Sequence, residues 1–178
     1  MTWEITHCLS MSSNFNPASA LHFRPAGAAD RPRLILLINS AFSIETFLEG
    51  TRTDDDGLAS MMEKGTILVA EDACGHPLAC VYTELRESNG KRGYLGMLAV
   101  DPVHQGSGLA RRLFAAAEEH FRAHGCDAVD ITVLSLRPEL PPIYRRFGFV
   151  ETGTEEFLLN RALKSGEECH CIVMSKQL

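Results

Sequence analysis

Apolar positions along the chain fall into alternating strand-like and helix-like segments, which predicts a single mixed domain. Apolar residues that alternate with polar ones, or that form short continuous runs, indicate strands, whereas recurrence every three or four residues indicates helices. The order β-α-α-β-β-β-α-β-α-β-β predicts an α+β fold around one mixed, mostly antiparallel sheet of about seven strands flanked by helices. The predicted strands are 21–26, 66–71, 77–87, 94–100, 130–134, one from 148 and one over 169–174.

The helical pattern marks four segments, of which three are short. Asp30 is a suitable N-cap for the first helix, which carries Pro32 in its first turn. Residues 43–57 are expected to form a loop, followed by a short helix around 58–62, and another short helix is expected at 143–146. The first helix places its apolar residues on one face: Leu34, Leu37, Ile38 and Ala41.

The longest predicted helix follows the most apolar strand. The strand 94–100 is mostly apolar, which is typical of a central strand covered on both faces. The helix from Gly108 to about His124 is amphipathic and ends before Gly125. Its apolar stripe repeats every four residues: Leu109, Leu113, Ala117 and Phe121.

Composition and charge exclude several classes of protein. The 178 residues are 45% hydrophobic and 22% charged, a mixture typical of one globular domain. The formal net charge of −6 argues against a general nucleic-acid binder, because that affinity comes mainly from clustered Lys and Arg. No stretch approaches the ~20 apolar residues of a membrane span, so no membrane partner is expected.

The N-terminal segment and the cysteines indicate a cytoplasmic protein. Residues 1–18 contain neither a basic start nor the apolar run of a signal peptide, so we expect an irregular leader followed by one domain over 19–178. The six cysteines include no Cys-x-x-Cys pair and are interpreted as free thiols in a reducing compartment. His104 and His120 have no partners at metal-ligand spacing, so no metal site is predicted.

The most informative segment joins the apolar strand to the long helix and reads Gln105-Gly106-Ser107-Gly108-Leu109-Ala110. Unpaired backbone N–H groups and the positive end of the helix dipole make such a junction a site for a pyrophosphate. Gly106 and Gly108 let the main chain approach the phosphates without a Cβ in the way. Arg111 and Arg112 add positive charge in the first turn, which is more useful beside a phosphate than beside a helix dipole.

The junction has three other interpretations. A nucleoside-triphosphate P-loop needs a Lys-Ser/Thr pair that the segment lacks. A dinucleotide-binding fingerprint needs a third glycine where Arg111 stands, and its turn follows its strand more tightly than Gly106 follows Val100. An ordinary strand-to-helix connection without a ligand remains an alternative.

The segment resembles the acetyl-CoA signature of the GNAT superfamily of N-acetyltransferases. Gln105-x-x-Gly108-x-Ala110 follows a strand ending in Leu-Ala-Val-Asp-Pro and precedes Arg-Arg-Leu-Phe, and the downstream Tyr-Arg-Arg-Phe-Gly-Phe stands in the expected order. The resemblance implies a sheet that splays open after Leu98-Ala99-Val100 and binds the pantetheine arm through main-chain groups. The implied acetyl-CoA contacts are Leu98, Ala99, Val100, Gln105, Gly106, Ser107, Gly108, Leu109, Ala110 and Arg111.

The resemblance also implies catalytic roles. Tyr144 lies where the family places its general acid, and a phenol of pKa ~10 can protonate a departing thiolate of pKa ~8.5. The alternative role is that of a tyrosine that only anchors a short helix. Relatives often carry the general base four or six residues before the last valine of the strand, but those positions here are Gly96 and Tyr94. Glu84 on the neighbouring strand is the candidate base, acting through water, and deprotonation of the amine by bulk water remains an alternative.

Three further charged features depart from the family pattern or carry no motif. Arg137 stands where many relatives have an asparagine, and it is a candidate contact for a coenzyme phosphate or an acidic substrate. Glu139 is a candidate contact for an amine. The acidic run Asp54-Asp55-Asp56 lies where the substrate loop is expected, and an exposed acidic turn is favoured over a cation site.

These observations predict an N-acetyltransferase that moves the acetyl group of acetyl-CoA to a primary amine of a small molecule or protein by direct transfer in a ternary complex. The family resemblance implies acetyl-CoA as cosubstrate and allows a homodimer. Two alternatives remain open: a non-catalytic acyl-CoA-binding sensor and a dinucleotide-binding protein.

Overall fold

A computed structural model describes residues 21–86, 91–157, 162–164 and 168–178, so the predicted leader and the turn at 88–90 lie outside the described residues. Seven strands form one sheet in the order β1-β2-β3-β4-β5-β7-β6, as the alternating pattern predicts. The strands are β1 (His22–Pro25), β2 (Thr66–Glu71), β3 (Pro77–Arg86), β4 (Arg92–Val100), β5 (Ala128–Leu134), β6 (Val150–Glu156) and β7 (His170–Gln177). The helices are α1 (Arg31–Ala41), α2 (Asp55–Lys64), α3 (Leu109–Ala123) and α4 (Leu140–Arg146).

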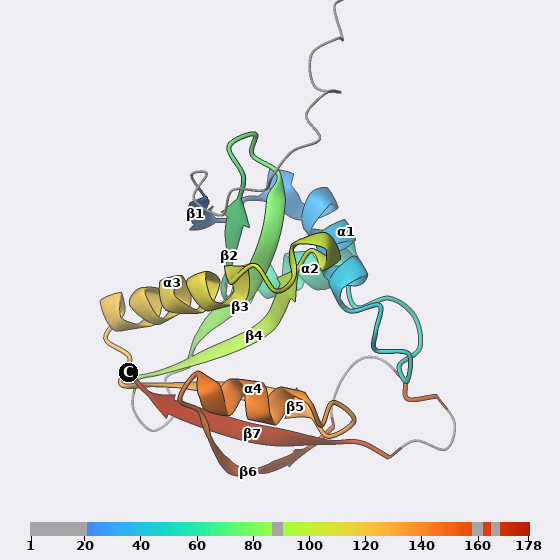
Figure 1. The fold of residues 1–178 in the computed structure, drawn as a ribbon, viewed down its shortest axis with the longest axis vertical. Helices are drawn as coiled ribbons and strands as arrows, with labels where there is room; N and C mark the ends of the chain where they lie inside the picture. The colour runs from blue at the N-terminus through green and yellow to red at the C-terminus, as the bar shows by residue number, and fades with distance from the viewer. Residues whose placement is uncertain (1–20, 87–90, 158–161, 165–167) are drawn as a thin grey trace, which may run out of the picture.

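The sheet opens between β4 and β5. These two strands are parallel and pair only over three positions, Arg92 to Tyr94 with Ala128 to Asp130. Beyond that point they diverge toward the loop that joins α1 to α2 (Figure 1). The predicted opening after Leu98-Ala99-Val100 is therefore placed too late, because pairing with β5 already ends at Tyr94.

An irregularity in β4 lies within the opening. Its register against β3 shifts between Cys80 and Tyr82, and Met97 takes a positive φ of 46°. A bulge bends its strand and increases the local twist, which turns the end of β4 away from β5.

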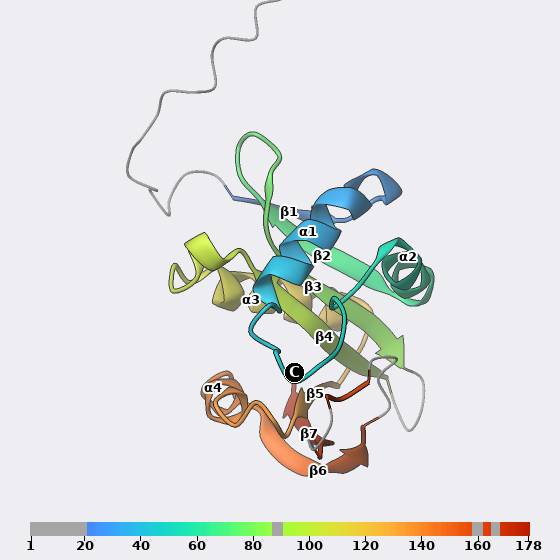
Figure 2. The same cartoon turned by 90° about the vertical axis from the view of Figure 1, so that its right-hand side faces the viewer.

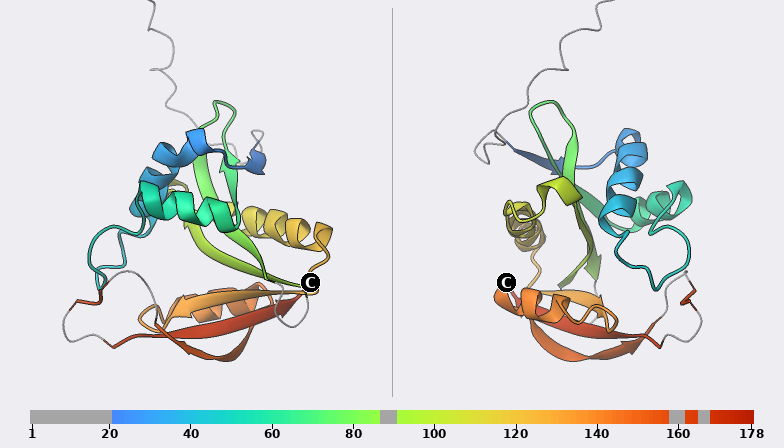
Figure 3. Two further views of the ribbon diagram at one scale, coloured as in Figure 1. Left: turned by 180° about the vertical axis from the view of Figure 1, so that it is seen from behind. Right: turned by 45° about the vertical axis from the view of Figure 1, so that its right-hand side comes forward.

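The helices cover both faces of the sheet. Figure 2 shows α1 and α3 on opposite sides of the first four strands, with α2 beside α1, and Figure 3 shows α4 against the layer formed by β5, β6 and β7. Two buried clusters follow from this arrangement, one beneath α1 and α2 and the other beneath α3. The predicted stripe of α3 supplies the second cluster with Leu109, Leu113, Ala117 and Phe121, all at most 2% exposed.

The starts of α2 and α4 and the cap of α1 differ from their predictions, and α4 begins at Leu140 instead of residue 143. The predicted loop over 43–57 is too long, because α2 already begins at Asp55. Asp54 is its N-cap and accepts a hydrogen bond of 2.8 Å from the amide of Gly57, so the acidic run starts a helix. Asp30 precedes α1 as predicted, but its carboxylate binds Arg24 and the amide of Gly27 instead of the first turn of that helix.

An aromatic cluster joins α3 to α4. The ring of Phe114 on α3 stacks on Phe147 at a centroid distance of 4.8 Å. It also meets Phe149 edge-on at 5.6 Å and lies 6.0 Å from Tyr144. Because Phe114 is only 2% exposed, it connects the packing of the core to the placement of Tyr144.

Truncation of this ring is expected to destabilise the fold strongly. Phe114→Ala should lower the free energy of unfolding by about 3–5 kcal/mol, because it removes a buried ring and leaves a cavity. Urea unfolding followed by circular dichroism measures the change. Leu36→Ala is the matched control, since Leu36 is 72% exposed on α1 and should change stability by at most ~0.5 kcal/mol. A loss below ~1 kcal/mol for Phe114→Ala would contradict this assignment of the core.

The loop between α1 and α2 is tied to the segment between β6 and β7. Leu48 forms an isolated bridge with Leu163, and the amide of Glu49 donates to the carbonyl of Ala162 at 3.0 Å. These contacts hold the loop across the open end of the sheet. Among the described helices, none combines the length and apolar character that crossing a membrane requires.

Candidate active site

The connection from β4 to α3 has the backbone conformation that its glycines predict. Gly106 and Gly108 have positive φ values of 76° and 85°. A Cβ added at either position would meet nothing within 4 Å, so the turn faces open space. The rest of the connection is braced internally, with Asp101 accepting from the amide of Val103 at 3.0 Å and Ser107 Oγ donating to the carbonyl of His104 at 2.6 Å.

The amides at the entrance of α3 lack internal partners. Gly108 is the N-cap residue and has no side chain that could accept from the first turn. Among the described residues, no hydrogen bond is found from the backbone N–H groups of residues 106–110. A helix start with unpaired amides and no acidic residue in its first turn favours an anionic ligand. The junction therefore fits a diphosphate, and the protein does not cap these amides itself.

The polar side chains around this entrance make different contacts. Gln105 donates from Nε2 to the carbonyl of Val100 at 3.4 Å, which links the turn back to the end of β4. Arg111 is exposed in the first turn of α3. The guanidinium of Arg112 lies over the ring of Phe23, 5.4 Å from its centroid, and so contributes to packing against β1.

A cavity of about 320 Å³ occupies the opening between β4 and β5. Residues 95–98 of β4 and 131–134 of β5 form its walls, and Gln105 and Ala110 bring the entrance of α3 to its edge. The end of α1, the loop after it and α4 complete the lining. Of the predicted acetyl-CoA contacts, the cavity brings together Leu98, Val100, Gln105 and Ala110.

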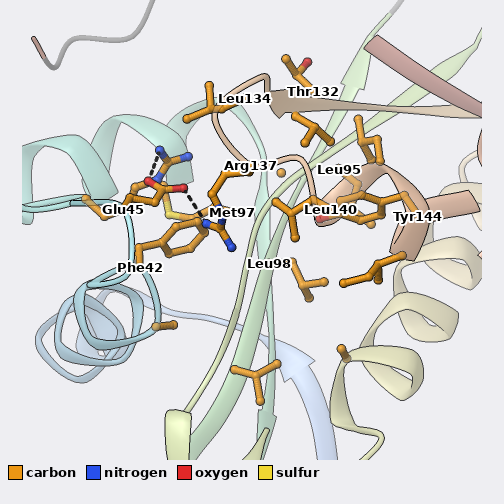
Figure 4. Close-up of a pocket in the computed structure, with 18 of the residues that line it drawn as sticks. Phe42, Glu45, Leu95, Met97, Leu98, Thr132, Leu134, Arg137, Leu140 and Tyr144 are labelled. Carbon is orange, nitrogen blue, oxygen red and sulfur yellow. Dashed lines mark hydrogen bonds and ion pairs between the residues drawn. The ribbon is translucent and has the colours of Figure 1, made fainter. Parts of the chain in front are cut away.

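Tyr144 belongs to this cavity. It comes from α4, and Figure 4 shows it on the same side as Leu140 and Leu98. Burial raises the pKa of its phenol to about 12, although the nearby Arg137 opposes the shift. The phenol is therefore a proton donor throughout the physiological pH range. Its ring is fixed by Phe114 and Phe149, at centroid distances of 6.0 Å from both.

Glu84 lies on β3, outside the lining of the cavity. Its carboxylate accepts a hydrogen bond of 2.8 Å from the hydroxyl of Tyr82 and one of 3.4 Å from Arg86. The structure thus does not bring Glu84 together with Tyr144, and a proton could pass between the cavity and this carboxylate only through intervening water.

The cavity also contains a buried ionic group that the sequence does not reveal. Glu45, in the loop after α1, accepts from Arg137 at 3.2 Å and from Arg52 at 3.3 Å (Figure 4). Its side chain is 4% exposed. Arg137 also binds Glu139, so the candidate contacts Arg137 and Glu139 lie at the cavity as a pair. No local motif marks Glu45, because its partner Arg137 is 92 positions away.

Other reactive side chains lie elsewhere. Asp72, Cys74 and His76 place potential ligand atoms within 4.8 Å of one another in the β2–β3 turn. Asp72 Oδ1 there accepts from the amides of Cys74 and His76, which accounts for its position as a turn residue. The described cysteines, Cys74, Cys80, Cys126, Cys169 and Cys171, are free thiols.

Comparisons with known sequences give a consistent result. The family model described as the acetyltransferase (GNAT) domain matches residues 36–160. Glucosamine 6-phosphate N-acetyltransferase 1 of Oryza sativa subsp. japonica is 32% identical over 143 residues, which cover 76% of this chain and 85% of the relative. The mycothiol acetyltransferase of Propionibacterium freudenreichii subsp. shermanii is 29% identical over 139 residues, and the match spans only 43% of that longer protein.

Solved structures share the fold at low sequence identity. The ribosomal-protein-alanine N-acetyltransferase from Brucella melitensis superimposes with a TM-score of 0.70 at 23% identity, covering 89% of this chain and all of the other. The yncA protein of Salmonella typhimurium, solved with its cofactor acetyl-CoA, gives a TM-score of 0.67 at 21% identity, with 89% and 94% covered. Taken with the extent of the family match, the splayed sheet and the glycine-bearing entrance of α3, these likenesses place the chain in the GNAT acetyltransferase family.

Proposed function

We propose that this protein transfers the acetyl group of acetyl-CoA to a primary amine of a small molecule or protein, directly and within a ternary complex. The observation that carries the proposal is the entrance of α3, where uncapped amides stand at the edge of the cavity that contains Tyr144. A diphosphate bound there would direct an attached arm along the open strand β4 toward the phenol. A non-catalytic acyl-CoA sensor remains the alternative.

The residues proposed to hold acetyl-CoA divide into two groups. The backbone amides of 106–110 face the pyrophosphate, and Arg111 adds a cation in the first turn. Main-chain groups of Leu98, Ala99 and Val100 have no partner on β5 and are available to a pantetheine arm as an added strand would be. Acetyl-CoA supplies an activated thioester, and the chain's own contribution is to orient it and to manage protons.

Tyr144 is proposed as the general acid. Its buried phenol keeps its proton at neutral pH, because desolvation disfavours the phenolate. It can therefore donate that proton to the sulfur of the departing thiolate. The amide of Val100 at the end of β4 is proposed to polarise the acetyl carbonyl.

Glu84 is the proposed base, acting through water, and its substitution provides a direct test. If Glu84 accepts the proton of the amine, Glu84→Gln should lower kcat by at least about tenfold, because general-base catalysis contributes on the order of 10²–10⁴. Asp127→Asn, an exposed change after α3, is the control. Unchanged turnover in Glu84→Gln would assign proton removal to bulk water.

The activity itself is tested by thiol release. Purified protein is mixed with acetyl-CoA and a panel of amino acids, amino sugars, polyamines, aminoglycosides and amino-terminal peptides, and free CoA is measured. Release that depends on an amine supports the transferase. Thermal stabilisation by acetyl-CoA without release with any amine would favour the sensor, and stabilisation by NAD instead of acetyl-CoA would favour a dinucleotide-binding protein.

A further inference from the structure

The lining of the cavity holds more basic than acidic residues, in a protein of negative net charge. Its lining contains two arginines, Arg52 and Arg137, and one acidic residue, Glu45, whereas the whole chain has a formal net charge of −6. Both arginines are partly enclosed, since their side chains are 16% and 15% exposed, and Arg137 has a second carboxylate partner, Glu139, outside the lining. Charges that are taken out of water at this cost are normally paired.

Arg52 is incompletely paired. One Nη donates to Glu45 at 3.3 Å, and the guanidinium lies over the ring of Phe42 at 4.6 Å from its centroid. Its Nε is buried and has no hydrogen-bond partner among the described residues. A guanidinium presents five N–H donors in a fixed plane, so Arg52 retains donors for a further acceptor.

Glu45 gives the two arginines a common anchor. Its carboxylate contacts Arg52 through one oxygen and Arg137 through the other. Figure 4 shows Glu45, Arg137, Phe42 and Met97 on one side of the cavity and Tyr144 on the other. The ionic group thus lies across the cavity from Tyr144, the proposed acid.

We infer that the acceptor is an amine that also carries an anionic group, a phosphate or a carboxylate, held by Arg52 and Arg137 while its amine faces the acetyl group. This inference rests on the proposed function and specifies its substrate class. Guanidinium groups bind both anions through charge-assisted hydrogen bonds, and Glu45 prevents the arginines from changing orientation when the site is empty of substrate. Polyamines and other purely cationic acceptors are disfavoured at this end.

Matched pairs of amines test the inference. O-phosphoethanolamine is compared with ethanolamine, and β-alanine with propanolamine, in the thiol-release assay at saturating acetyl-CoA. We expect kcat/KM to be about tenfold or more higher for the anionic member of at least one pair, because charge-assisted hydrogen bonds are the stronger class. The pair that shows the larger ratio distinguishes phosphate from carboxylate recognition.

Variants connect the preference to the two arginines. Arg52→Gln and Arg137→Gln should each reduce the ratio within the preferred pair to near one, while acetyl-CoA affinity is unchanged. Arg52→Lys keeps the charge and should retain part of the ratio, which separates lost recognition from lost folding. Arg33→Gln, exposed on α1 outside the cavity, is the control.

Binding provides a readout that does not depend on turnover. Calorimetry on the CoA-saturated protein should detect O-phosphoethanolamine or β-alanine but not the partner that lacks the anionic group, and Arg52→Gln should abolish the signal. If turnover occurs but kcat/KM is equal within both pairs, or is higher for the amine that lacks the anionic group, the inference is overturned and the proposed transferase stands. Absence of turnover with every amine would overturn the proposed transferase. Calorimetry would then test the anion site by itself, and absence of binding of both O-phosphoethanolamine and β-alanine would refute that site.

Discussion

Tyr144→Phe is expected to lower kcat by about 10²-fold or more while the dissociation constant of acetyl-CoA stays within about twofold of the parent value. The substitution removes only the hydroxyl, and the ring contacts with Phe114 and Phe149 that hold α4 remain. Loss of turnover with retained coenzyme affinity is the signature of an interaction made only in the transition state. Steady-state thiol release and calorimetry with acetyl-CoA measure the two quantities.

The pH profile provides an independent test of the same assignment. Because burial raises the pKa of Tyr144 to about 12, its proton is present below that value and is lost only as the pH rises through it. An ordinary phenol would lose its proton near pH ~10. We therefore expect no alkaline loss of kcat with a midpoint near 10. A midpoint near 10, or full activity in Tyr144→Phe, would remove this residue from the mechanism.

Gly106→Asp is expected to weaken acetyl-CoA binding by at least about tenfold relative to Gly106→Asn. Both side chains have the same size, both tolerate the positive φ of 76° better than other residues, and both have open space at the new Cβ. Their difference is therefore the carboxylate, placed beside the amides proposed to bind the pyrophosphate. Repulsion between unit charges about 4 Å apart is ~1 kcal/mol in bulk water and ~4 kcal/mol near a protein surface, and tenfold weaker binding, which is ~1.4 kcal/mol, lies within that range.

Salt dependence and a remote charge provide the controls for this pair. The difference between Asp and Asn should shrink as ionic strength rises, because exposed charges are screened. Gly75→Asp places the same carboxylate at another open glycine of positive φ, in the β2–β3 turn, and should leave acetyl-CoA binding unchanged. Equal affinities for Gly106→Asp and Gly106→Asn at low salt would show that no diphosphate binds at this entrance.

Local sequence patterns predicted much of the architecture. Each element depends on side chains a few positions apart, such as the four-residue repeat of α3 and the glycines that precede it. The predicted strands were therefore confirmed with shifts at their ends, and α3 begins at Leu109, one residue after its predicted start. The errors at the start of α2 and at the opening of the sheet involve a cap and a bulge, which depend on backbone geometry more than on periodicity.

Only the tertiary structure decided which charged side chains meet. The sequence offered Glu84 as the candidate base acting through water, but the sheet holds Glu84 against Tyr82 and brings Glu45 to the cavity instead. Glu45 and Arg137 are 92 positions apart, and their contact depends on the loop after α1 crossing the open end of the sheet. The chain alone therefore determined where acetyl-CoA is expected, through a contiguous run of backbone groups. The ionic end of the cavity was decided by folding, because its charges come from segments that no local pattern relates.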